Sequence, residues 1–441
     1  MPANAPIDSS AMLSSGSTQA PTIRCAPGRN ERGDMTTTTP IVGGSTPETD
    51  IYDNHQYGTG VPHEKLARLR RDSPVLWHEL PDGGGCWYLL KHADVAAASK
   101  DPITFSAARG GIVIEDQTPE ALARVKTQLL SMDPPEHREL RNLVLTAFTP
   151  KTIDAMSSWL RERSRAIMQE AAGMGTCDFV MDVAGELPMQ TINQMMDVPE
   201  VHRKRIVTLA DEVIAGGGGR DRAAAEDPGA QLGALGYEMA SARKGKDGTD
   251  LISLMLKATY QGHPLDEVEF AGLFVQIAVA ANETTRSLLS GALIALVQNP
   301  DAWSTLASDY SKIPVAVEEM LRWVTPVHYF RRTATRDVVV RGRTIREGDR
   351  VVLHYTSANF DEDVFDDPFR FDVTRDPNPQ LAFGWGEHFC LGARLARLET
   401  RIFFEELFDH FAAVEIIGPA TRLESNLTNT TKRVPVRLTP R

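Results

Sequence analysis

The feature of this chain that most constrains its fold is the stretch from 267 to 300, EVEFAGLFVQIAVAANETTRSLLSGALIALVQNP. Drawn as a helix, the stretch places apolar side chains on most faces, and no charged residue stands between Glu269 and Glu283. A helix that is apolar all round lies inside a large protein or a membrane. Its uncharged run 271–281 is shorter than the ~18–20 residues that a membrane span needs. The stretch therefore predicts a long central helix in a large helical protein, without a membrane span.

Helical patterns dominate the rest of the chain, and strand patterns gather near its two ends. Two prolines open a helical pattern at 134–148, where a missing N–H costs least, and an amphipathic pattern at 160–173 ends on a glycine. Short strands at 74–80 and 86–91 flank a glycine turn and predict a hairpin. Strands and helices do not alternate, so we expect a mainly α fold with small β-sheets, in the α+β class. Further helices are expected at 314–324 and 391–411, and further strands at 337–355 and 413–438.

Composition and charge limit the class of protein. With 441 residues, of which 42% are apolar and 24% charged, the chain can bury a large core. Its net charge of -12 argues against nucleic acid, whose partners carry a basic face. Residues 1–50 are rich in Ser, Thr, Pro and Gly, so we expect a disordered extension there and one catalytic domain over 51–441.

The four cysteines stand far apart and include no C-x-x-C pair, which argues against zinc ribbons and thioredoxin-like chemistry. The start of the chain has no secretory apolar region, so disulfides are not expected and a cytoplasmic location is favoured.

One of these cysteines, Cys390, stands in an unusual loop, FGWGEHFCLG, at 383–392. Gly384 and Gly386 permit tight turns and close approach to a bulky partner. A helix is expected from 391 onward, and its N-terminus stabilises a thiolate for nucleophilic attack or metal ligation. The alternative is a buried cysteine that acts as a small hydrophobe. A dinucleotide loop does not fit, because Phe389 stands where the third glycine belongs.

The loop fits the pattern F-G-x-G-x-H-x-C-x-G and so resembles the haem-binding loop of the cytochrome P-450 superfamily. The resemblance extends over about 60–438 and implies that superfamily's fold, with haem b between this loop and the long central helix. It implies that Cys390 is the thiolate ligand of the haem iron. Phe383 and Gly384 then contact the cofactor, and His388 reaches a haem propionate.

A second resemblance lies at Glu319 and Arg322, which match the E-x-x-R pair of the superfamily. Residues three apart on a helix share a face and can pair, although such pairs are also common on surfaces. In the superfamily this pair is buried and braces the core behind the haem. A third partner is usually an arginine in the segment between this pair and the cysteine loop, and Arg375 is our candidate. The sequence departs from a common bacterial form at Phe360, where that form has an arginine.

The central helix contains the segment AANETTR at 280–286, which resembles the superfamily's A-G-x-D/E-T segment on the distal face of the haem. The resemblance implies that Thr284 assists oxygen activation, that Glu283 delivers protons, and that Ala280 contacts haem and substrate. Two structural alternatives exist. Thr284 can bond back to a carbonyl one turn earlier, and Glu283 can pair with Arg286.

Four basic residues match the positions that bind haem propionates in the superfamily. His137 and Arg141 are four apart and share a helix face, and a mixed-charge surface helix is the alternative. Arg332 and His388 resemble two further propionate partners, with Arg332 preferred over Arg331 from its RTA context. Two buried carboxylates need cations of this kind.

The resemblance implies a monooxygenase that activates O₂ with two electrons from a ferredoxin and its ferredoxin reductase, and we expect a monomer. Arg394, Arg397 and Arg401 follow the cysteine at helical spacing and could steer an acidic ferredoxin, or form an ordinary solvated face. A haem-thiolate peroxygenase or isomerase, and a haem or ligand binder without catalysis, are the alternative functions.

The substrate is expected to be a hydrophobic small molecule of terpenoid, sterol or lipid, or aromatic type. By resemblance, Val279, Ala280, Val327 and Tyr329 face it. The segments 107–115 and 426–430 resemble the roof of the site and the turn that enters it. The glycine run 216–219 falls where the superfamily has a mobile lid, and otherwise reads as a helix connection.

Overall fold

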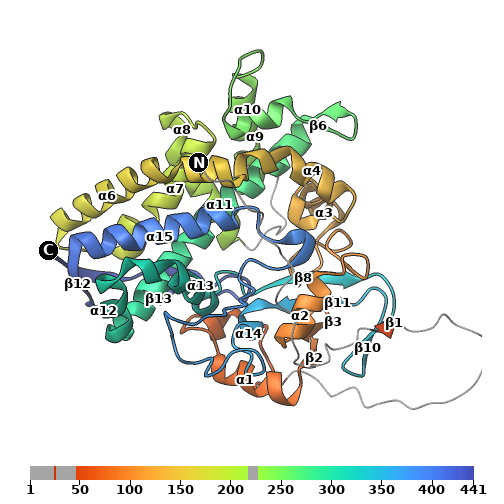
Figure 1. Cartoon of the computed structure of the whole chain (residues 1–441). Coiled ribbons are helices and arrows are strands. Elements are labelled where there is room, and N and C mark those ends of the chain that lie inside the picture. Colours follow the sequence, from red (N-terminus) through yellow and green to blue (C-terminus); the bar gives the residue numbers. More distant parts are fainter. Residues whose placement is uncertain (1–23, 26–45, 217–226) are drawn as a thin grey trace, which may run out of the picture.

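A computed structural model describes residues 24–25, 46–216 and 227–441. Its centre is helix α11 (Glu267–Gln298), in the position predicted for a long buried helix (Figure 1). A capping box begins this helix, since the Asp266 carboxylate accepts from the amides of Val268 and Glu269 while the Glu269 side chain accepts from the Asp266 amide. Pro300 begins the next helix directly afterwards. The sequence therefore fixes both ends of the central helix locally.

Other helices surround α11. It contacts α7, α8, α9, α12 and α13, while α15 packs on α6 and α13. The remaining helices have the following bounds: α1 His63–Asp72, α2 His92–Ser99, α3 Pro119–Val125, α4 Glu136–Leu145, α5 Pro150–Ala155, α6 Ser157–Met174, α7 Glu186–Met195, α8 Glu200–Ala215, α9 Pro228–Ser241, α10 Leu251–Lys257, α12 Pro300–Ser308, α13 Ile313–Val324, α14 Tyr355–Ala358 and α15 Ala393–His410.

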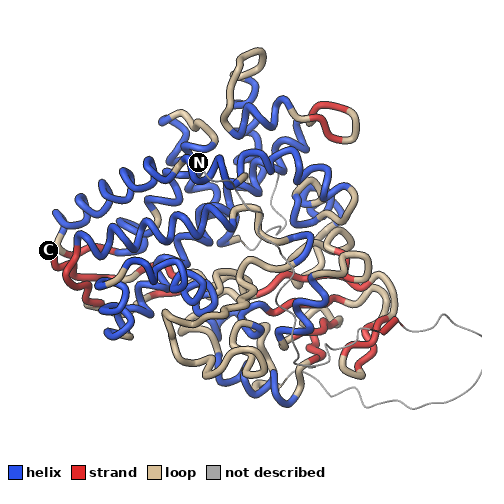
Figure 2. Tube along the Cα trace, in the orientation of Figure 1, coloured by secondary structure: helices blue, strands red, loops and turns tan. Residues whose placement is uncertain are grey.

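Most strands form small sheets on two flanks of the helical body, while the short hairpin at 259–264 stands apart from both (Figure 2). The largest sheet has the order β2-β3-β11-β8-β4, in which only β3 and β11 run parallel. Its hairpin of β2 and β3 was predicted from the sequence. Small sheets beside a mainly helical body confirm the α+β class. The strands of this sheet are β2 Val75–Glu79, β3 Gly85–Leu89, β4 Phe105–Ser106, β8 Tyr329–Ala334 and β11 Arg350–His354.

A second sheet of order β12-β15-β5 lies beside the C-terminal end of α15, on the other flank. A third sheet has the order β1-β9-β10, and two two-stranded sheets complete the set. Their strands are β1 Arg24–Cys25, β5 Thr176–Asp178, β6 Thr259–Tyr260, β7 His263–Pro264, β9 Val338–Val340, β10 Arg343–Ile345, β12 Phe411–Ile416, β13 Thr421–Arg422, β14 Thr431–Arg433 and β15 Pro435–Pro440.

The buried core of the described residues divides into four apolar clusters, and the two largest meet along α11. Phe270, Leu273 and Phe274 belong to one cluster, and Leu289 and Leu293 belong to the other. The polar segment 282–287 lies between them on the same helix, and most of its side chains are buried. Buried polar groups are costly without partners, so this midpoint is the place in the helix where function is to be sought.

Some predictions lie outside the described residues. They include most of the extension 1–50 and the glycines 217–219, whereas Gly216 caps the end of α8. The division into an extension and a catalytic domain stays a prediction. Within the described ranges, every helix is too short or too polar to cross a bilayer.

Candidate active site

The loop that holds Cys390 is fixed by its glycines and by one backbone hydrogen bond. Gly384 and Gly386 have φ values of 69° and 71°, a region that favours glycine. A Cβ at Gly386 would stand 2.5 Å from the Ser99 carbonyl oxygen, so the loop passes close to the end of α2. The Cys390 amide donates to the Phe383 carbonyl at 2.9 Å, which folds the loop back on itself. Both glycines are therefore structural requirements of the loop.

The Cys390 side chain is accessible to solvent, and the surrounding protein partly desolvates its sulfur. Burial raises the pKa of this thiol, while the Gly392 N–H and the charges of Arg141 and Arg397 act in the opposite direction. The Gly392 N–H and the two arginine charges would therefore stabilise a thiolate once a metal replaces the thiol proton.

Basic side chains gather beside this loop. The imidazole rings of His137 and His388 lie 4.3 Å apart. The Arg141 guanidinium donates to the Phe389 carbonyl at 2.7 Å. The Arg332 guanidinium, 4% exposed, donates to the Arg331 carbonyl and forms no ion pair within the described ranges. The four side chains predicted to bind propionates are thus brought together.

Among the described residues, this basic cluster has one nearby carboxylate, Glu387, whose Oε2 lies 4.0 Å from His137 Nδ1. Burial and the neighbouring guanidinium groups lower the pKa of His137 to about 4 and that of His388 to about 2. The His137 Nδ1 and His388 Nε2 atoms are buried without a hydrogen-bond partner in the described chain. Two carboxylates would supply both the missing acceptors and the missing charge, so the site fits the propionates of a haem.

The structure also separates the two neighbouring arginines of β8. Arg331 donates to the Ile114 carbonyl at 3.0 Å and forms an ion pair with Asp116 at 2.8 Å. Its charge is therefore already compensated, whereas that of Arg332 is not. This difference favours Arg332 as the propionate partner, as the sequence indicated.

Replacing Arg332 by leucine should weaken haem retention while leaving the haem-free protein as stable or more stable. The change removes a buried charge that has no anion until a propionate arrives. Loss of a charge-assisted hydrogen bond predicts roughly 10- to 100-fold faster haem transfer to an acceptor protein. Arg331→Leu is the matched control, and it should destabilise the haem-free protein instead. Equal haem transfer from wild type and Arg332→Leu would contradict the assignment.

The middle of α11 places both predicted catalytic residues at the pocket, and both also make structural contacts. The Thr284 hydroxyl donates to the Ala280 carbonyl at 2.8 Å. Glu283 is buried and pairs with Arg286, which also binds Asp211 of α8 at 3.0 Å. Both alternatives raised by the sequence are therefore present. Yet Glu283 Oε1 is buried without a partner in the described chain, so one carboxylate oxygen stays free to accept a proton.

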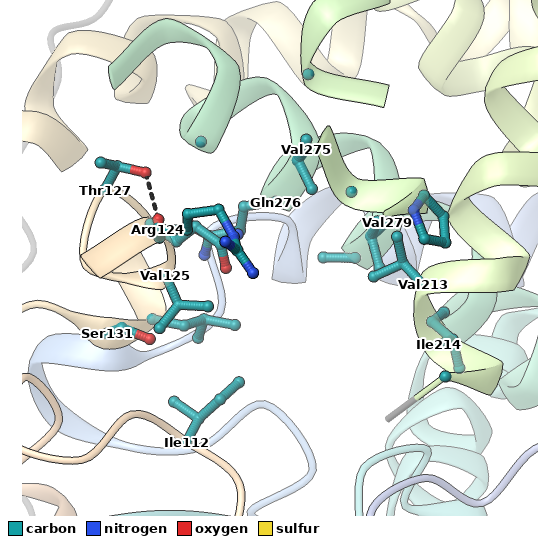
Figure 3. A pocket seen from close by; sticks show the side chains of 18 of the residues that line it. Ile112, Arg124, Val125, Thr127, Ser131, Val213, Ile214, Val275, Gln276 and Val279 are labelled. Atoms are coloured by element: carbon teal, nitrogen blue, oxygen red, sulfur yellow. Dashed lines mark hydrogen bonds between the residues drawn. The ribbon is translucent and has the colours of Figure 1, made fainter. Parts of the chain in front are cut away.

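A cavity of about 480 Å³ lies against this part of α11. Figure 3 shows side chains of the 112–131 segment and of α8 on opposite sides of the space, with Gln276 and Val279 of α11 between them. Its lining includes Val279, Ala280 and Val327, as predicted. Most other lining side chains are apolar or small, so the cavity suits a hydrophobic ligand.

The prediction that Tyr329 faces this cavity is wrong. Its side chain is 2% exposed and packs with Tyr88, Ile114 and Val352. The neighbouring Phe330 lines the cavity instead. Successive side chains of a strand point to opposite faces. In β8, Tyr329 therefore faces the core and Phe330 faces the cavity.

Part of the wall was not found from the sequence. The predicted roof, 107–115, contributes Ile112 and Val113, and the predicted turn, 426–430, contributes its residues 427 and 428. The segment 117–131, with α3 in its middle, contributes a larger share of the lining. Its sequence has neither a motif nor a long apolar run, so no local signal could have found it.

The predicted brace behind the loop is present. Glu319 and Arg322 are 0% exposed, with Nε and Oε2 2.7 Å apart. Arg375 Nε lies 3.1 Å from the same oxygen, so Arg375 is the third partner. The Phe360 ring covers the Arg322 guanidinium at 4.9 Å. An aromatic face therefore stands where many bacterial relatives place an arginine, and the cation–π contact stabilises the same guanidinium.

The three arginines that follow the loop are paired with carboxylates. Arg394 binds Asp154 at 2.6 Å and Arg397 binds Glu318 at 2.6 Å. Arg401 binds Glu405 at 3.3 Å. They do not form an uncompensated basic patch, because each positive charge has a negative neighbour.

Comparison with known proteins places the chain in a family. The sequence model of the family described as Cytochrome P450 matches residues 236–432. A steroid C26-monooxygenase of Mycolicibacterium smegmatis is 37% identical, over 84% of this chain and 88% of that protein. A methyl-branched lipid omega-hydroxylase of Mycobacterium bovis is 39% identical, over 84% of this chain and 90% of that protein.

Solved structures agree with the sequence comparison. A cytochrome P450 of Mycobacterium marinum, in complex with pseudoionone, has a TM-score of 0.78 and 34% identity, over 85% of this chain and 94% of that one. A cytochrome P450 of Novosphingobium aromaticivorans reaches a TM-score of 0.81 at 29% identity, over 89% and 97% of the two chains. With the cysteine loop, the basic cluster and the central helix in place, the chain belongs to the cytochrome P450 family of haem-thiolate monooxygenases.

Proposed function

We propose that this monooxygenase hydroxylates an elongated hydrophobic molecule of sterol or lipid type, with electrons from a ferredoxin and its reductase. The observation that carries the proposal is the apolar cavity of about 480 Å³, whose lining includes Glu283 and Thr284. The relatives named as a steroid monooxygenase and a lipid hydroxylase support the substrate class. A monomeric state and a cytoplasmic location, expected from the sequence, are parts of the same proposal.

The residues around the cofactor site have distinct tasks. Cys390 would hold the haem iron as a thiolate. His137, Arg141, Arg332 and His388 would bind the haem propionates. The bound haem supplies the oxygen-activating chemistry, which an electron-rich thiolate ligand favours.

The residues of α11 handle protons and water. At rest the Thr284 hydroxyl donates to the Ala280 carbonyl, and a rotation about its side-chain bond turns that donor toward the pocket. Glu283 holds or releases a proton at Oε1, while Arg286 keeps its other oxygen in place. Val279, Val327 and Phe330 exclude water around the substrate.

Ligand titration tests the substrate class. Sterols, fatty alcohols, terpenoids and aromatic compounds are added to the holoenzyme, and the change in haem spin state is followed as water leaves the iron. We expect the sterol and lipid members to give the largest change, and hydroxylated products when ferredoxin, its reductase and O₂ are supplied. Turnover that needs peroxide and ignores ferredoxin would favour the peroxygenase alternative.

A surface hollow beside the cysteine loop is our candidate for ferredoxin docking. This hollow of about 400 Å³ is lined by Lys100, Arg138, Arg141, Asn142, Gly386 and Glu387. Trp385 is 41% exposed, and the Lys100 Nζ lies 5.2 Å from the centre of its ring. Arg138 is bound by Glu387, and Arg141 donates to the Phe389 carbonyl. Lys100 is therefore the cation best able to meet an acidic partner.

Reversing the charge at Lys100 with Lys100→Glu should slow reduction by an acidic ferredoxin several-fold at low salt. Arg394→Glu should have a smaller effect, because Asp154 already compensates that guanidinium. Lys204→Glu, on α8, is the control and should not alter the rate. Stopped-flow reduction at two salt concentrations measures the effect, which should fade at high salt. Equal rates for Lys100→Glu and Lys204→Glu would exclude this docking surface.

A further inference from the structure

The pocket has a polar group at a fixed place on an otherwise apolar helix face. Gln276 lies one turn before Ala280 and two turns before Thr284 on α11, and all three line the cavity. Residues four apart on a helix share a face, so the three form one stripe. At 1.5 Å per residue, Gln276 lies about 12 Å along the helix axis from Thr284. The stripe therefore connects a side-chain amide to the catalytic end of the pocket.

The stripe narrows just beyond Gln276. The next position, one turn earlier, is Gly272, which also lines the cavity but lies so close to Thr127 that an added Cβ would collide with its side chain. The Thr127 hydroxyl donates to the Arg124 carbonyl at 2.8 Å, which fixes the turn after α3 in this place (Figure 3). A ligand that extends from Thr284 along α11 therefore meets the Gln276 amide before it reaches the narrow place at Gly272.

The Gln276 amide has unused hydrogen-bonding capacity. Its Oε1 atom is buried, and no group within the described ranges donates a hydrogen bond to it. A buried amide oxygen without a donor destabilises a protein, and such groups normally find a partner. A side-chain amide offers both an acceptor and two donors. After a rotation about its terminal bond, the amide can present its oxygen to a ligand hydroxyl or its N–H groups to a ligand ketone.

The charged groups of the lining are mainly acidic. Glu212, Asp227 and Glu267 line the cavity, and Arg124 is the one basic residue among the described lining residues. Arg124 lies 3.5 Å from Asp227, whereas Glu212 and Glu267 are exposed and form no ion pair in the described part of the chain. A free carboxylate at the end of a ligand would meet this negative charge and be disfavoured. A neutral oxygen would not.

We propose that Gln276 is a specificity-determining residue that binds a neutral hydroxyl or ketone oxygen at one end of an elongated apolar substrate. The opposite end of that substrate lies beside Thr284, where it is hydroxylated. The inference rests on the proposed function, because it takes the cavity to be the substrate site. We therefore expect the cavity to bind sterol ketones and fatty alcohols more tightly than free fatty acids. Compact terpenoids should also bind less tightly, because they cannot reach from Thr284 to the amide.

The test compares wild type with Gln276→Leu, which keeps the size of the side chain and removes its hydrogen bonds. Gln128→Leu, also on the pocket wall, is the matched control. Each holoenzyme is titrated with hexadecanol, hexadecane and palmitate, and with cholestanone and cholestane, while the haem spin state is followed. In wild type we expect hexadecanol or cholestanone to bind about tenfold more tightly than the matching hydrocarbon. Gln276→Leu should remove this preference, and Gln128→Leu should keep it.

Three outcomes would overturn the inference, and they differ in what they leave standing. A preference for the oxygenated ligand that persists in Gln276→Leu would refute the role of Gln276 and leave the proposed function intact. Tighter binding of palmitate than of hexadecanol, lost in Arg124→Ala, would show a carboxylate site at Arg124 instead. If none of these ligands changes the spin state of a haem that is bound and reducible, the proposed substrate class fails, and the inference fails with it.

Discussion

Cys390→Ala should abolish monooxygenase activity, down to the level of the haem-free protein. The change removes the thiolate that the loop presents, and no other cysteine within the described ranges stands in this loop. The four basic side chains that fit the propionates remain, so part of the haem should still bind. That haem would lack the thiolate whose electron donation favours O–O cleavage. Activity should therefore fall much further than haem content.

The spectrum of the reduced carbon monoxide complex measures this directly. In Cys390→Ala we expect the band to move from the thiolate position to that of haem with a neutral ligand. Cys177→Ala is the control, because Cys177 lies in β5, in the sheet of β12 and β15. It should keep both the spectrum and the activity of wild type. A thiolate spectrum in Cys390→Ala would mean that another residue binds the iron.

Elements with local start and stop signals were predicted closely. The central helix was expected at 267–300 and extends over Glu267–Gln298, because the capping box at Asp266 and the proline at 300 mark its ends. The β2–β3 hairpin likewise follows from alternating apolar residues around a glycine turn. The expected helix 134–148 is in fact shorter: α4 ends at Leu145 and a 3-10 turn continues from Thr146 to Phe148. Such ends depend on tertiary contacts that the local sequence does not record.

The cofactor side of the site was more predictable than the substrate side. Cys390 and the basic residues stand in short motifs, because a fixed cofactor demands fixed partners at fixed spacing. The pocket wall needs only apolar side chains of suitable size, so many sequences serve. For this reason Tyr329 was predicted to line the cavity, whereas Phe330 does so. A shift of one residue along a strand moves a side chain to the opposite face. Gln276 was missed because a single polar residue on an apolar helix has no motif around it.

The brace at Glu319 is where a single substitution should cost the most stability. Its carboxylate accepts from Arg322 at 2.7 and 2.8 Å and from Arg375 at 3.1 Å. It also accepts from the Asp372 amide at 2.9 Å and from the Asn378 side chain at 3.0 Å. Asn378 lies only five residues before Phe383, so the brace connects α13 to the chain that leads into the cysteine loop. Loss of this carboxylate should therefore disturb the haem site as well as the core.

Glu319→Gln should lower the free energy of unfolding by ~3–5 kcal/mol, because it leaves a buried guanidinium without its anion. The new glutamine amide would also point N–H groups at the N–H donors that the carboxylate now accepts from. Its neighbour supplies the matched control. Glu318 pairs with Arg397 at a partly exposed site, so Glu318→Gln should cost about 1 kcal/mol or less. Urea unfolding of the holoenzymes, followed by circular dichroism, measures both changes.

A double variant, Glu319→Leu with Arg322→Met, separates the effect of charge from that of lost volume. Apolar side chains of similar size can replace a buried ion pair at little net cost, whereas removing one partner alone leaves an uncompensated charge. The double variant should therefore be more stable than Glu319→Gln, although Arg375 loses its carboxylate in both. Arg375 is 11% exposed, so it retains some access to water and limits that loss. If Glu319→Gln unfolds at the same urea concentration as Glu318→Gln, the brace is not an energetic support of the fold.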